Sequence, residues 1–66
     1  MIKKYFLLVD GTSDAQRMID LISENDYNAL FWPNQSHDFF EFEIDLEEDE
    51  LLTLMLQIKC HLKPKS

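Results

Sequence analysis

One segment near the middle of the chain constrains the fold more than any other, because two patterns overlap there. Apolar side chains take every second position of residues 40–46, which is the spacing of one buried face of a β-strand. Glu41, Glu43 and Asp45 fall between them and are therefore expected on the opposite face. Residues 47–50 are all acidic, as in the first turn of a helix, where carboxylates meet the positive end of the helix dipole. The segment predicts a strand with one acidic face that leads directly into a helix.

The remaining segments predict two more strands and a second helix. Residues 3–9 form an apolar run typical of a strand, and residues 27–32 form another before a turn cluster. Apolar side chains at helical spacing predict a helix over residues 14–25. The acidic segment supplies a strand at about residues 38–45 and a helix over about residues 46–63, where a proline ends it. The predicted order of elements is β-α-β-β-α.

This order predicts a small α+β domain in which two layers pack together. A right-handed crossover makes the first and second strands parallel, and the third strand, antiparallel to both, lies between them. The result is a three-stranded mixed sheet in the order 1-3-2, with both helices on one face. The architecture resembles a ferredoxin-like fold truncated before its last strand. It leaves the edge of the first strand bare, and a bare edge is a route to a homodimer.

Length and composition narrow the classes of function. The 66 residues are expected to form one acidic domain, 1–66, with a core too thin to leave room for a deep catalytic cleft. The net charge is −7, and no Lys or Arg lies between Met18 and Ile58, which disfavours direct binding to nucleic acid or to anionic membranes. The single cysteine, Cys60, excludes an internal disulfide and suits a reducing cytoplasm. The apolar run before Asp10 is too short for a signal peptide or a membrane-spanning helix.

The residue types that usually carry catalysis or hold metals do not form a recognisable group. The soft metal ligands are His37, Cys60 and His61, and the last two are neighbours on the predicted second helix. Neighbours on a helix point about 100° apart, so they do not easily share one ion or act as a nucleophile and its base. We therefore predict a protein that is not an enzyme and that has no catalytic, cofactor or metal site.

The acidic strand face suggests contact with another protein. Carboxylates on alternate strand positions lie about 7 Å apart, close to the spacing of successive phosphates along a nucleic-acid strand. Such a face can imitate nucleic acid; the alternative is a plain solvated face. Trp32 and Phe39 flank the hairpin turn as aromatic anchors of an interface or as lids on the core.

The second helix carries more apolar surface than one sheet needs. Its main apolar stripe, which is wide enough to cover a sheet, consists of Leu51, Leu54, Met55, Ile58 and Leu62. Leu52 and Leu56 lie about 100° round from its main stripe, and they offer either an apolar contact, including a second route to a homodimer, or burial under a tilted helix. The predicted partner-binding residues are Trp32, Asp38, Phe39, Glu41, Glu43, Asp45, Glu47, Glu48, Asp49, Leu52 and Leu56.

These observations favour a small regulator or inhibitor that presents a negative surface to a basic, nucleic-acid-binding protein. Small acidic single-domain proteins of bacteriophages, including inhibitors of host nucleic-acid-binding machinery, are similar in size and charge, which suggests a phage protein. The alternative is a ferredoxin-like or ACT-like module that forms homodimers and senses a ligand or assembles with itself.

Overall fold

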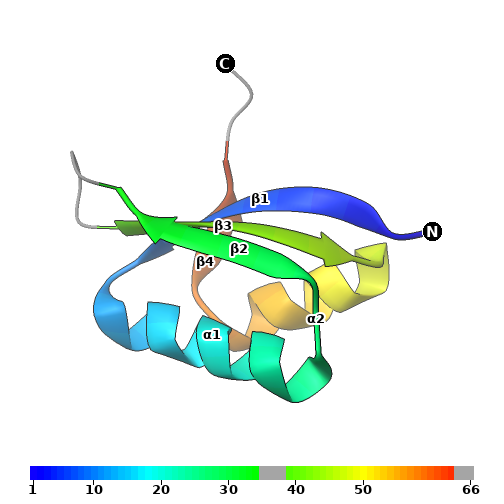
Figure 1. Ribbon diagram of the computed structural model, residues 1–66, viewed down its shortest axis with the longest axis horizontal. Helices are drawn as coiled ribbons and strands as arrows, with labels where there is room; N and C mark the ends of the chain where they lie inside the picture. The colour runs from blue at the N-terminus through cyan, green and yellow to red at the C-terminus, as the bar shows by residue number, and fades with distance from the viewer. Residues whose placement is uncertain (35–38, 64–66) are drawn as a thin grey trace.

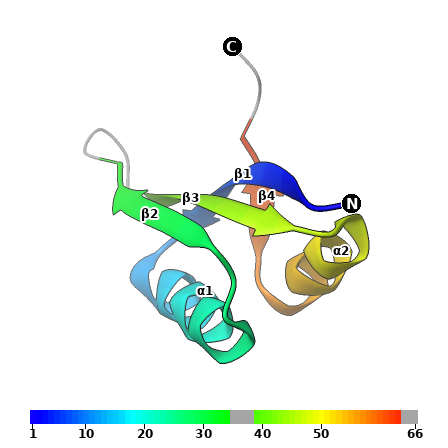
Figure 2. The same ribbon diagram turned by 45° about the vertical axis from the view of Figure 1, so that its right-hand side comes forward.

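The computed structural model describes residues 1–34 and 39–63, which form a four-stranded sheet and two helices. In chain order the elements are β1 (Lys3–Asp10), α1 (Thr12–Asn25), β2 (Ala29–Pro33), β3 (Phe39–Leu46), α2 (Glu48–Gln57) and β4 (Cys60–Leu62). The strands lie in the order β2-β3-β1-β4, and each neighbouring pair is antiparallel. Both helices lie on the same face of this sheet, and no described element covers the other face (Figures 1 and 2). The prediction of a two-layer α+β domain is confirmed.

The main difference from the sequence-based prediction is the fourth strand. The second helix ends at Gln57 instead of continuing to residue 63, and Ile58 already has an extended backbone with φ −130° and ψ 133°. Cys60–Leu62 then pairs with residues 7–9 of β1. The prediction of a truncated, three-stranded mixed sheet is therefore wrong. The element order β-α-β-β-α-β is that of a complete ferredoxin-like arrangement, and the first three strands keep their predicted relative order.

The edge of β1 is also less exposed than the sequence predicts. β4 covers residues 7–9, and the Lys63 N–H donates to the Phe6 carbonyl at 2.8 Å. Of the described strand, only the first residues of β1 keep an unpaired edge, and they include Lys3 and Lys4. Charged residues, lysine above all, discourage pairing with another strand at such an edge. The prediction that the whole edge of β1 is bare is therefore wrong, whereas a dimer through β1 stays a prediction.

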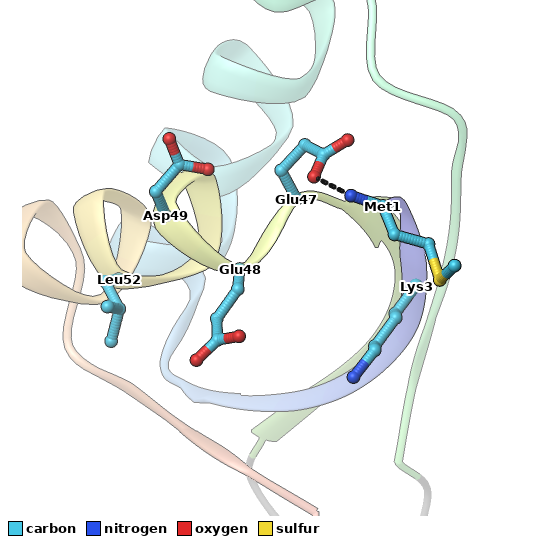
Figure 3. Close-up of a pocket in the computed structure, with 6 residues that line it drawn as sticks. All are labelled: Met1, Lys3, Glu47, Glu48, Asp49 and Leu52. Carbon is cyan, nitrogen blue, oxygen red and sulfur yellow. Dashed lines mark hydrogen bonds and ion pairs between the residues drawn. The ribbon is translucent and has the colours of Figure 1, made fainter.

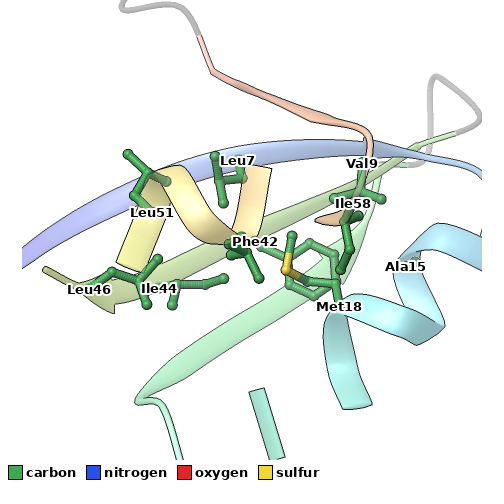
Figure 4. Close-up of a cluster of buried hydrophobic side chains, with 10 residues drawn as sticks. Leu7, Val9, Ala15, Met18, Phe42, Ile44, Leu46, Leu51 and Ile58 are labelled. Carbon is green, nitrogen blue, oxygen red and sulfur yellow. The ribbon is translucent and has the colours of Figure 1, made fainter. Parts of the chain in front are cut away.

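The core lies between the sheet and the two helices (Figure 4). The predicted alternation holds on β3, where Phe42, Ile44 and Leu46 are buried. Leu51 and Ile58 reach the core as the apolar stripe of the second helix predicts, whereas Met55 is only partly buried. The other buried apolar side chains among the described residues are Leu7, Val9, Ala15, Met18 and Leu54.

The ends of the two helices have local causes. Gly11 precedes α1 with φ 86°, a backbone conformation that glycine adopts without the steric cost met by other residues. This places the helix start at Thr12, two residues ahead of the predicted start at residue 14. At the start of α2 the Glu47 N–H donates to a Glu50 carboxylate oxygen at 2.8 Å. This contact belongs to a capping box formed by Glu47 and Glu50, with which α2 begins.

Core truncation should cost far more stability than removal of the exposed leucines on α2. Ile44→Ala leaves a cavity at a fully buried position of the central strand and should lower the free energy of unfolding by about 2–5 kcal/mol. Leu56 is 89% exposed, so Leu56→Ala should change it by less than about 0.5 kcal/mol. Urea unfolding followed by circular dichroism measures both. Equal losses in the two variants would contradict this assignment of the core.

Candidate protein-binding face

The face of the sheet opposite the helices, called here the open face, brings charged and apolar side chains together. Strand register defines it, because side chains alternate between the two faces and paired residues share one face. Trp32 pairs with Glu41 and Leu30 pairs with Glu43, while β1 places Leu8 and Phe6 on the other side of the same two glutamates. The open face consists of Lys4, Phe6, Leu8, Asp10, Leu30, Trp32, Phe39, Glu41, Glu43, Asp45, His61 and Lys63.

Glu41 is the most enclosed carboxylate of the open face. Its side chain is only 12% exposed and forms an ion pair with the Lys63 ammonium group, which crosses β1 to reach it. The Asn34 amide donates to the other carboxylate oxygen at 3.0 Å. The hydrogen bond from Lys63 holds the pKa of the Glu41 carboxyl below its ordinary value, and hydrogen bonds from Asn34 and Trp32 lower the pKa further.

The other two carboxylates of β3 are held more loosely. Glu43 is 21% exposed, and its nearest cation, the Lys4 ammonium group, lies 3.9 Å away. Asp45 accepts a hydrogen bond at 2.8 Å from the Asn28 side-chain amide, and its backbone N–H donates to the Asn28 carbonyl at 3.0 Å. Glu43 and Asp45 therefore keep more capacity than Glu41 to receive a cation from outside.

Exposed apolar side chains border this acidic row on both sides. Phe6 is 44% exposed on β1, and Leu30 and Trp32 are 62% and 39% exposed on β2. Phe6, Leu8 and Leu30 are members of this face that were not predicted from the sequence. The available signal was that residues 3–9 are apolar at both even and odd positions, so one set had to lie away from the helices.

A second acidic group surrounds the start of α2 and does not belong to the open face. Glu47, Glu48 and Asp49 line an open depression together with Met1, Lys3 and Leu52 (Figure 3). The Met1 ammonium group contacts a Glu47 carboxylate oxygen at 2.6 Å, and this hydrogen bond raises the pKa of that ammonium group.

The structure thus divides the residues that the sequence predicted as one partner-binding set. The open face holds Trp32, Phe39, Glu41, Glu43 and Asp45, whereas Glu47, Glu48, Asp49 and Leu52 surround the depression at α2. Leu52 and Leu56 are exposed on α2, so a tilted helix does not bury them. Asp38 lies outside the described residues.

Among the described residues, no three His, Cys, Asp or Glu side chains come close enough to hold a metal ion. Burial raises the pKa of the Cys60 thiol, and Asp14 raises it further, which favours the protonated, poorly nucleophilic form at neutral pH. No helix in the described ranges has the length and apolarity that a membrane span requires. No family model, curated protein or solved structure matches the chain.

The Lys63–Glu41 ion pair should make stability fall in acid. The folded pKa of Glu41 lies below its ordinary value of 4.5, so the stabilisation is fully present above about pH 4.5 and is lost as pH falls through the folded pKa. Lys63→Met should raise the pKa of Glu41 and reduce this acid-dependent loss. NMR titration of the Glu41 carboxyl carbon, with urea unfolding at several pH values, measures both effects.

Lys59→Met provides the matched control, because Lys59 is exposed beside β4 and the substitution changes the net charge equally. Lys59→Met should leave the pKa of the Glu41 carboxyl unchanged. A Glu41 carboxyl that titrates identically in the wild type and in Lys63→Met would contradict the assigned ion pair.

Proposed function

We propose that this protein is a non-enzymatic regulator that binds a basic segment of another protein on its open face. The observation that carries this proposal is the position of the acidic row. Glu41, Glu43 and Asp45 lie on the sheet face that no described helix covers, between the exposed side chains of Phe6 on one side and Leu30 and Trp32 on the other.

Mixed apolar and acidic surfaces of this kind suit arginine- or lysine-rich partners. The apolar parts of long cationic side chains pack on Trp32 and Leu30, while their charged ends reach the carboxylates beyond them. Partial burial strengthens each charge contact relative to one in open water. The net charge of −7 adds long-range attraction, which raises the association rate at low salt.

The partner that we favour is a nucleic-acid-binding protein, which the acidic row would engage in place of nucleic acid. The three carboxylates repeat about every 7 Å along β3, close to the spacing of phosphates. Occupation of the partner's basic surface by this row would block nucleic acid, and the protein would then act as an inhibitor. A cytoplasmic location is part of this proposal, because such partners act there.

The first test uses a deca-arginine peptide as the cationic probe. Trp32 is the only tryptophan and lies on the open face, so its fluorescence should change as the peptide binds. Glu43→Gln should weaken binding about three- to tenfold, because it removes the more accessible glutamate of the face. The affinity should fall steeply with added salt.

The control for this test is Glu24→Gln, which removes the same charge from the exposed surface of α1. It should lower the affinity by less than about twofold, since only the overall charge changes. Equal effects of the two substitutions would sink the proposal, because they would mean that net charge alone attracts the peptide.

The second test concerns the Lys63 ammonium group, which already pairs with the Glu41 carboxylate. A basic partner must compete with Lys63 for this carboxylate, so Lys63→Met should tighten deca-arginine binding. Lys59→Met changes the net charge equally at an exposed lysine other than the one that pairs with Glu41. Tighter binding by Lys63→Met than by Lys59→Met, in fluorescence titrations at the same salt concentration, is the expected result. The reverse order would contradict a role for Glu41.

A further inference from the structure

The outer edge of β2 is an unpaired strand edge. In an antiparallel ladder, successive residues direct their backbone groups alternately to the two sides. The Asp45 N–H donates to the Asn28 carbonyl and the Asn34 N–H donates to the Phe39 carbonyl, so even-numbered residues of this segment bond to β3. The backbone groups of Ala29, Phe31 and Pro33 therefore point outward, where no described strand lies.

This edge is uncharged and apolar. Residues 27–34 contain no charged side chain, in a chain of net charge −7. Leu30, Phe31 and Trp32 are 62%, 47% and 39% exposed. Pro33 stands at an outward position, where its missing N–H breaks no bond to β3. The opposite edge of the sheet differs, because it consists of the three-residue strand β4 and of the start of β1, which carries Lys3 and Lys4.

The acidic charge of the chain favours the β2 edge as the place where a second copy of the protein binds. Two copies of an acidic chain repel each other over most of their surfaces, and the β2 edge is a segment where they can meet without opposing carboxylates. The sequence of β2 is also self-complementary when two copies run antiparallel and Phe31 faces Phe31. Leu30 of each copy then lies opposite Trp32 of the other, and Ala29 lies opposite Pro33.

We propose that the protein forms a two-fold homodimer in which the β2 strands of two copies pair antiparallel about Phe31. The two Phe31 residues exchange both backbone hydrogen bonds, and each Ala29 N–H donates to the Pro33 carbonyl of the second copy. Leu30 and Trp32 form aliphatic–aromatic cross-strand pairs on the open face. The Phe31 rings, each stacked on Phe42 with centroids 5.3 Å apart, meet on the helix side.

Such a dimer continues the sheet through both copies and keeps the two open faces on one side. The acidic rows on the two β3 strands are then separated by three strand spacings, about 14 Å. The dimer does not depend on the proposed binding of basic proteins. A protein that dimerises but does not bind deca-arginine would contradict only the proposed function. A protein that binds deca-arginine as a monomer would contradict only the dimer.

Sedimentation equilibrium from about 1 µM to about 1 mM tests this proposal over the range in which small interfaces associate. The wild type should dimerise as concentration rises. Leu30→Lys places a charge in the pairing and should weaken dimerisation at least about tenfold. Leu56→Lys makes the same exchange at an exposed leucine of α2 and should leave the dimer intact.

A backbone variant separates strand pairing from side-chain effects. Ala29→Pro removes an outward N–H while sparing the bonds from β2 to β3, so it should reduce dimerisation. Circular dichroism confirms that each variant is folded before it is compared. A wild type that stays monomeric to about 1 mM would overturn the proposal and leave the edge to a strand of another protein. A dimer that Leu56→Lys weakens as much as Leu30→Lys would also overturn it.

Discussion

The central strand β3 has an apolar face in the core and a face of carboxylates, and the rest of the structure stabilises both faces. One of its faces supplies Phe42, Ile44 and Leu46 to the core, and the other carries three carboxylates. Neighbouring strands on both sides partly withdraw those carboxylates from water, which is costly for unpaired charges. Lys63, Asn34 and Asn28 offset this cost by donating to Glu41 and Asp45. The strand can therefore stay central while its acidic side remains accessible.

Much of this arrangement can be predicted from the sequence, because the strongest signals are periodic. The alternation of residues 40–46 locates β3 within one residue, and helical spacing locates α1 within two. A crossover that makes β1 and β2 parallel leaves room between them for the antiparallel β3, which is the relative order that the structure has. These predictions succeed because burial of one apolar face determines each element, and burial leaves a direct trace in the sequence.

The fourth strand could not be predicted in the same way. Cys60–Leu62 is too short to show an alternation, and Ile58 and Leu62 continue the helical spacing of α2. What makes this segment a strand is its pairing with β1, which local sequence does not encode. The site shows a similar limit. The acids of the open face are evident from β3 alone, whereas the ion pair from Lys63 to Glu41 depends on β4.

The pairing of β1 with β3 has a consequence for how the chain folds. Lys3 lies opposite Leu46, so the two central strands come from distant parts of the sequence. A long loop must close before they meet, so the chain loses conformational entropy before the strand pairing can stabilise it. The β2–β3 hairpin involves a short loop and can form early. We expect β1 to pair with β3 of this hairpin late, and β4 to add last at the free edge of β1, so folding should be slower than in helical domains of this size.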